Sequence, residues 1–243
     1  MENKNGSGIF LGVVSVATLI VAIIGATFAY FSATVTGNGN VDVTAYEFNA
    51  SLSISPVYPT SAAKIIPMDP TGTVTGYNTP EGTNNTNLLY AINEATNKCV
   101  DTAGHQVCTV YSATFKNNGS EDITLEGVLK TTKNDKSATL ENGTPFANLK
   151  IVELTGALGT DNNPNTFALG STLDVPTAVG GTKELEDVEV EAGETVTKYF
   201  VVYLNEADED NNPEMGASYT GQLVYTSSTG AQELTGTFNL GGQ

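Results

Sequence analysis

The chain has 243 residues and a formal net charge of −17, because 27 aspartates and glutamates stand against 10 lysines and no arginine. Such a chain lacks the basic surface that nucleic-acid binding requires, so we expect no nucleic acid among its partners. The single histidine, His105, excludes catalytic and metal sites built on several histidines. A hydrophobic content of 40% is too high for a fully disordered chain, and the length suits one or two domains.

An apolar segment near the N-terminus predicts a hydrophobic helix that directs export. Residues 9–24 carry no charge, but the apolar segment reaches the ~20 residues of a membrane-spanning helix only if it continues through Phe31. The small residues that follow predict a signal peptide, residues 1–29, which a signal peptidase cuts between Ala29 and Tyr30. The alternative is an uncleaved anchor. In both cases the body lies outside the cell and meets the membrane only through this segment.

The segment after the expected cut, residues 30–40, is predicted to be extended. Phe31, Ala33 and Val35 alternate with polar residues, so they fall on one face of a strand. Two roles suit such a segment. It can be a first strand paired within its own subunit, or a donor strand that pairs with an exposed sheet edge of a neighbouring subunit.

Residues 41–243 are expected to form a single all-β domain, an antiparallel sandwich of the jelly-roll or Ig-like kind. Short runs that alternate apolar and polar residues, separated by turn signals, predict about eight or nine strands and no long amphipathic helix. The expected strands are residues 41–48, 51–55, 107–115, 123–129, 149–154, 188–190, 195–204, 219–225 and 234–238. Stretches rich in Pro, Thr, Gly and Asn predict long insertions at about residues 56–98 and 156–187.

Two cysteines flank a turn-like stretch inside this domain. Cys99 and Cys108 are nine positions apart, and the residues between them, such as Asp101 and His105, favour a hairpin. A hairpin brings two Cα atoms within the ~4.4–6.8 Å that a disulfide needs. A metal site would have both cysteines and His105 but no fourth ligand nearby. We therefore favour a disulfide, which agrees with export.

The best candidate for a cation site is the acidic segment between the expected strands 195–204 and 219–225. Asp208, Asp210 and Asn212 alternate along it and Glu214 follows, and their oxygen atoms are the ligands that Ca²⁺ prefers. The glycine and the final glutamate of an EF-hand are missing, so the alternative is a solvated acidic loop. Ca²⁺ is the one cofactor that the sequence suggests.

Four segments follow one another in an order that resembles a known family. They are Gly-Ala-Thr-Phe-Ala-Tyr-Phe-Ser at residues 25–32, Gly-Asn-Val-Asp-Val-Thr-Ala at 39–45, Tyr-Ser-Ala-Thr-Phe-Lys-Asn-Asn-Gly-Ser at 111–120 and Gly-Ala-Ser-Tyr-Thr-Gly-Gln-Leu-Val-Tyr at 216–225. Together they resemble the TasA/camelysin family of secreted bacterial matrix-fibre proteins, the substrates of SipW-type signal peptidases. The cysteine pair and the insertion after residue 56 depart from that family's basic pattern, which would suit a minor or capping subunit.

The resemblance implies a jelly-roll subunit of an extracellular fibre or biofilm matrix on a bacterial surface. Its partners would be copies of itself or related fibre subunits, joined by donation of the N-terminal strand. The alternative is a membrane-anchored, pilin-like or adhesin-like sandwich that binds a ligand or glycan through its loops. We expect no enzyme, because a zinc peptidase of the H-E-x-x-H type needs two histidines and no Gly-x-Ser-x-Gly elbow accompanies His105.

Overall fold

The computed structural model describes residues 49–60, 64–71, 87–93, 98–101, 104–159, 165–206, 212–228 and 232–241. The chain divides into a unit of residues 1–46 and a unit of residues 47–243, and every described residue belongs to the second. The expected signal segment, its cut, the donor segment and the expected strand 41–48 lie outside the described residues. Across the described ranges, no helix has the length and apolar character needed to cross a membrane.

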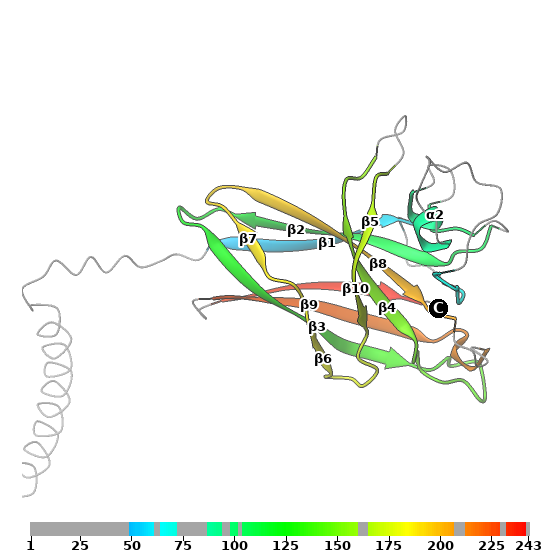
Figure 1. The fold of residues 1–243 in the computed structure, drawn as a ribbon. Coiled ribbons are helices and arrows are strands. Elements are labelled where there is room, and N and C mark those ends of the chain that lie inside the picture. Colours follow the sequence, from blue (N-terminus) through cyan, green and yellow to red (C-terminus); the bar gives the residue numbers. More distant parts are fainter. Residues whose placement is uncertain are drawn as a thin grey trace, which may run out of the picture. The chain divides into compact units, whose positions relative to one another are not determined.

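Two antiparallel sheets face each other and form a β-sandwich (Figure 1). The first sheet has the strand order β1-β2-β8-β4-β5, and the second has the order β10-β9-β3-β6, with β7 also paired to β3. The strands are β1 (Ala50–Tyr58), β2 (Cys108–Asn117), β3 (Ile123–Asp135), β4 (Leu149–Thr155), β5 (Ala168–Asp174), β6 (Thr182–Glu184), β7 (Val188–Val190), β8 (Thr195–Leu204), β9 (Ser218–Ser227) and β10 (Glu233–Leu240). The expected all-β antiparallel sandwich is confirmed.

The main core lies between the two sheets, where the period-two pattern of each strand places its apolar residues. Aromatic rings dominate its centre: Tyr111 stacks on Phe200 at a centroid distance of 5.3 Å, and Phe238 contacts both at the same distance. Gly221 of β9 lets the Phe238 ring approach the backbone, because a Cβ there would lie 2.3 Å from the ring. Aromatic pairs of this kind contribute about 0.5–1.5 kcal/mol beyond the apolar area that they bury.

A second apolar cluster lies on the outer face of the first sheet, beneath the short helix α2 (Asn87–Asn93). Leu88 and Ile92 of α2 are fully buried and belong to the same cluster as Val110 of β2 and Val201 of β8. Because the main core covers one face of the first sheet and this second cluster covers the other, β2 and β8 carry apolar residues on both faces. The first sheet is therefore the middle layer of this part of the molecule, as Figure 1 shows at the α2 end.

The expected disulfide is present within this second cluster. Cys99 and Cys108 are joined with a Cα–Cα distance of 4.9 Å, and both are completely buried. An isolated antiparallel bridge between Val100 and Gln106 provides the hairpin between them. Because both sulfur atoms form the disulfide, the alternative of a metal site on these cysteines does not apply to this structure.

The second insertion was expected as a long loop, and the structure corrects that prediction in part. Strands β5 and β6 lie inside it, and β5 pairs with β4 at the edge of the first sheet. Most β5 side chains are exposed and the strand contains Gly170, so it lacks the apolar alternation by which a strand is recognised. Likewise, helix α2 has only seven residues, too few for an amphipathic period to be evident.

Candidate functional site

Strand β1 is the outermost strand of the first sheet, and its free side is one candidate site. The N–H of Asn118 donates to the carbonyl of Asn49 at 2.7 Å, which sets the alternation of hydrogen bonds between β1 and β2. In that alternation, Ser51, Ser53 and Ser55 direct their main-chain groups toward β2. The main-chain N–H and C=O groups of the intervening residues 50, 52 and 54 point away from β2. We call these groups the open edge, and among the described residues no strand pairs with them.

The side chains along the open edge face the core but are covered only in part. Ala50, Leu52 and Ile54 are half-buried against the main core. Ile54 lies across β10, where a Cβ at Gly236 would come within 2.5 Å of the Ile54 side chain. The inward residues of β10, in contrast, are almost completely buried, as Phe238 at 2% exposure shows. The core is therefore covered less well along β1 than along the facing strand.

One feature limits the length of the open edge, and another occupies a main-chain group on β10, the edge strand of the second sheet. Pro56 follows the same alternation as Ile54, so the N–H that it lacks would have belonged to the open edge, and the ladder shifts register between Pro56 and Tyr58. The open edge thus ends before Pro56. On β10, the edge strand of the other sheet, the carbonyl of Asn239 already accepts a hydrogen bond of 2.5 Å from the Tyr111 hydroxyl.

A cavity between the two sheets is the second candidate site. Its volume is about 280 Å³, close to the lower end of the ~300–1,000 Å³ typical of small-molecule sites. It lies toward the β5 edge of the first sheet, the edge opposite β1, and is bordered by β4, β5, β8 and the connection from β6 to β7. Its apolar walls include Ala113, Ile151, Leu173, Leu185, Phe200 and Leu223.

Charged residues from three segments gather where this cavity opens. Glu153 of β4 lies 3.5 Å from the Nζ of Lys198 of β8, measured to its Oε1. Glu186 accepts a hydrogen bond of 3.1 Å from the hydroxyl of Ser171, and Asp187 is its neighbour in the chain. We call the carboxylates of Glu153, Glu186 and Asp187 the acidic mouth.

Burial raises the pKa of Glu153 above its ordinary value, and the neighbouring carboxyl of Glu186 raises it further, although Lys198 acts in the opposite direction. A carboxyl whose pKa is higher in the folded state than in the unfolded state reduces stability as the pH rises through the folded pKa. At neutral pH the ionised Glu153 is therefore a local cost, which an added cation would relieve.

Tyr225 lines the same cavity and has a hydroxyl without a hydrogen-bond partner in the described part of the chain. The residue is only 6% exposed. Burial raises the pKa of Tyr225, and the negative charges of Glu153, Asp187 and Glu186 raise it further. The hydroxyl faces the cavity, so an occupant of the cavity can form a hydrogen bond with it.

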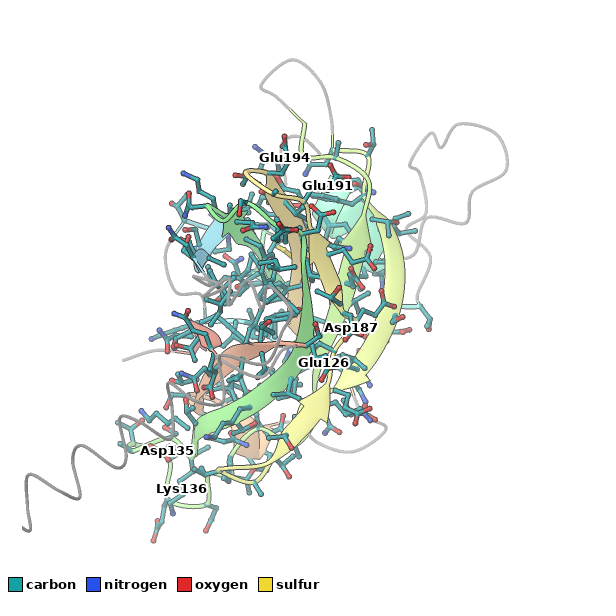
Figure 2. All side chains as sticks on the ribbon, turned by 90° about the vertical axis from the view of Figure 1, so that its left-hand side faces the viewer. Glu126, Asp135, Lys136, Asp187, Glu191 and Glu194 are labelled. Atoms are coloured by element: carbon teal, nitrogen blue, oxygen red, sulfur yellow. A yellow bond between two sulfur atoms is a disulfide. The ribbon has the colours of Figure 1, made fainter. Side chains whose placement is uncertain are left out.

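Acidic residues continue along the outside of the second sheet, as Figure 2 shows. Glu126 lies on β3 and Asp187 just before β7, which pairs with β3, while Glu191 and Glu194 occupy the turn between β7 and β8 (Figure 2). Both turn residues are exposed and do not line the cavity. They provide a comparison for the acidic mouth, because they carry the same charge outside it.

The expected Ca²⁺ segment is described only at its end. Asp208 and Asp210 lie outside the described residues, and Asn212 begins the 3₁₀ helix η1 (Asn212–Glu214). Glu214 is 6% exposed, and its Oε1 accepts a hydrogen bond of 2.8 Å from the N–H of Ala147. Among the described residues, no three acidic, histidine or cysteine side chains are placed to share a metal ion. The Ca²⁺ site stays a prediction.

Of the remaining predicted site residues, the structure places the cysteine pair only, since Ala29, Tyr30, Phe31, Ala33 and Val35 lie outside the described ranges. The sequence does contain a signal for the acidic mouth. Glu153 and Lys198 occupy inward positions of β4 and β8, where alternation calls for apolar residues. A charge on a core-facing position marks either an ion pair or a site.

Comparison with known proteins identifies no family. No family model matches the chain, and no curated protein matches it. Structures that align with it include the bacterial hydrophobin BslA, at 9% identity over 80% of this chain and 95% of that chain with a TM-score of 0.28. The CooA pilin subunit from enterotoxigenic Escherichia coli aligns at 14% identity over 59% and 87%, with a TM-score of 0.23. A FixG-related protein from Vibrio parahaemolyticus aligns at 11% identity over 56% and 79%, with a TM-score of 0.29. Likeness at this level carries no functional inference, and membership of the TasA/camelysin family stays a prediction.

Proposed function

We propose that the protein is a structural subunit of an extracellular fibre or biofilm matrix, in which the N-terminal segment of one subunit pairs with the open edge of the next. The observation that carries this proposal is the open edge itself, whose main-chain groups pair with no described strand and whose apolar side chains are half covered. Backbone hydrogen bonds to such an edge provide affinity, and alternate side chains provide specificity.

In this arrangement, Phe31, Ala33 and Val35 of the donor segment extend the apolar inner face of the first sheet beyond Leu52 and Ile54. Each main-chain hydrogen bond contributes about 0.5–1.5 kcal/mol, and burial of apolar area contributes ~25 cal/mol per Å². Donor and acceptor are different surfaces of the same subunit, so each subunit has one of each. A head-to-tail contact that does not close on itself produces an open filament.

Removing the donor tests the proposal most directly. Electron microscopy of the exported protein should show filaments, and deletion of residues 30–38 should abolish them because the donor strand is lost. Filaments that persist without these residues would refute strand donation. N-terminal sequencing of the same material distinguishes the two models of export: Tyr30 as the first residue supports the fibre subunit, and an intact Met1 supports the membrane-anchored alternative.

A substitution at the acceptor tests the other side of the contact. Ala50→Pro removes one N–H from the open edge without removing a hydrogen bond to β2, and a proline is tolerated at the start of an edge strand. Loss of one hydrogen bond should raise the protein concentration needed for assembly roughly fivefold. Ala50→Ser keeps the N–H and is the matched control. Equal assembly of the two variants by light scattering would exclude the open edge as the acceptor.

A further inference from the structure

We propose that the cavity between the sheets binds a small organic ammonium ion, with its apolar body between the two sheets and its charged group at the acidic mouth. This site is separate from the open edge, because it lies toward the β5 side of the first sheet whereas β1 is the strand at the other side. The inference does not depend on strand donation.

The shape of the cavity follows from the residue at one inward position of β2. Tyr111, Ala113 and Phe115 all face the main core, and the small side chain of Ala113 leaves space between two aromatic residues. Leu185 lines the cavity from the connection between β6 and β7. An unfilled apolar space forfeits van der Waals contacts of its walls, so an apolar body of matching size is favoured there.

The charges at the mouth determine the sign of the head group. Glu184 also lines the cavity, so four carboxylates and one lysine surround it, and in the described part of the chain no cation pairs with Glu186 or Asp187. Lys198 pairs with Glu153 at 3.5 Å, so this lysine leaves Glu186 and Asp187 without an ion-pair partner among the described residues. An ammonium group has three N–H donors and no acceptor, which complements carboxylates that only accept.

Two further observations favour an organic ion over a bare metal. Tyr225 lines the cavity, its hydroxyl has no hydrogen-bond partner among the described residues, and it can accept a hydrogen bond from an ammonium group. Within the same residues, the carboxylates are not close enough together for three of them to hold a metal. Carboxylates spread around an apolar opening suit a ligand that has both a charge and a body.

Titration of the purified full chain with n-hexylammonium, followed by calorimetry, tests the site. We expect saturable binding of one ligand per chain, with 1-hexanol and hexanoate binding at least about tenfold more weakly because they lack the positive charge. Equal binding of 1-hexanol would show that the acidic mouth contributes nothing. The absence of saturable n-hexylammonium binding would overturn the proposal.

Two double variants separate the acidic mouth from the acidity of the whole protein. Glu186→Gln with Asp187→Asn should weaken n-hexylammonium binding about tenfold. Glu191→Gln with Glu194→Gln changes the net charge equally but lies on the β7–β8 turn (Figure 2), so it should leave the binding unchanged. An equal loss in both double variants would assign the binding to general charge and refute the site.

A third variant tests the tyrosine without changing any charge. Tyr225→Phe removes a hydroxyl that has no partner in the described residues, so the melting temperature should change little. Affinity for n-hexylammonium should nevertheless fall several-fold, while the weak binding of 1-hexanol should change less. Unchanged n-hexylammonium affinity in a folded Tyr225→Phe protein would contradict the role of the hydroxyl in the site.

Discussion

At the scale of single residues, one buried asparagine connects the turn after β2 to a neighbouring strand. Asn117 ends β2 and is 1% exposed. Its Nδ2 donates to the carbonyls of Glu121 at 2.7 Å and Val190 at 3.1 Å, while its Oδ1 accepts from the N–H of Gly119 at 2.9 Å. The side chain therefore holds the β2–β3 turn against the end of β7. The sequence pattern indicated a turn here, but not which asparagine stabilises it.

We predict that Asn117→Ala lowers the free energy of unfolding by about 2–3 kcal/mol, because it leaves buried carbonyls without donors. The neighbouring Asn118 has an exposed side chain, so Asn118→Ala should change stability by less than about 0.5 kcal/mol. Denaturant unfolding of the two variants measures the difference. Similar losses in both would contradict the role assigned to Asn117.

At the scale of elements, the disulfide connects the end of helix α2 to the start of β2. The N–H of Cys99 donates to the carbonyl of Ala91 at 2.6 Å, and Cys108 is the first residue of β2. The carbonyl of Ile92 accepts hydrogen bonds from the Tyr58 hydroxyl at 2.6 Å and from Asn165 at 2.7 Å. A seven-residue helix is not stable alone, so these contacts and the cluster beneath it hold α2 in place.

We predict that Cys99→Ala with Cys108→Ala lowers the free energy of unfolding by ~3 kcal/mol, because the unfolded chain regains the entropy of a short closed loop. Thermal unfolding monitored by circular dichroism measures this effect. A reducing agent should lower the melting temperature of the unmodified protein by a similar amount and leave the variant unchanged. A variant as stable as the unmodified protein under oxidising conditions would refute the prediction.

At the scale of the whole molecule, the net charge of −17 opposes association. Screening limits this repulsion to roughly 10 Å at 0.1 M salt. In the proposed fibre, subunit contacts would bring like charges together, so the carboxylates would bind protons more tightly in the assembled state than in the free subunit. Assembly is therefore favoured as the pH falls toward the ordinary carboxylate pKa values of about 4.

We predict that filament formation increases with NaCl concentration and as the pH falls from about 8 to about 4–5. Light scattering and electron microscopy of the processed protein measure it, and sucrose serves as an uncharged control. Assembly that is constant over this pH range would show that charge does not control it. Ca²⁺ should promote assembly more than Na⁺ at equal ionic strength only if the segment containing Asp208 and Asp210 binds it.

The sequence by itself determined the sandwich class, because alternation with a period of two is a local property of each strand. Residues 195–204 were predicted as a strand with the bounds that β8 has in the structure, and the cysteine spacing predicted the disulfide. Strand β5 was missed for the same reason, since its exposed residues carry no alternation.

Only the tertiary structure decided which strand has an open edge and which charges meet. The open edge depends on which strands lie beside β1 in the sheet. Among the described strands its one partner is β2, which begins 50 residues after β1 ends at Tyr58. The acidic mouth combines Glu153 of β4 in the first sheet with Glu186 and Asp187, which lie in the connection between β6 and β7 of the second sheet. Both features arise from contacts between distant segments, and local alternation contains no information about which segments will meet.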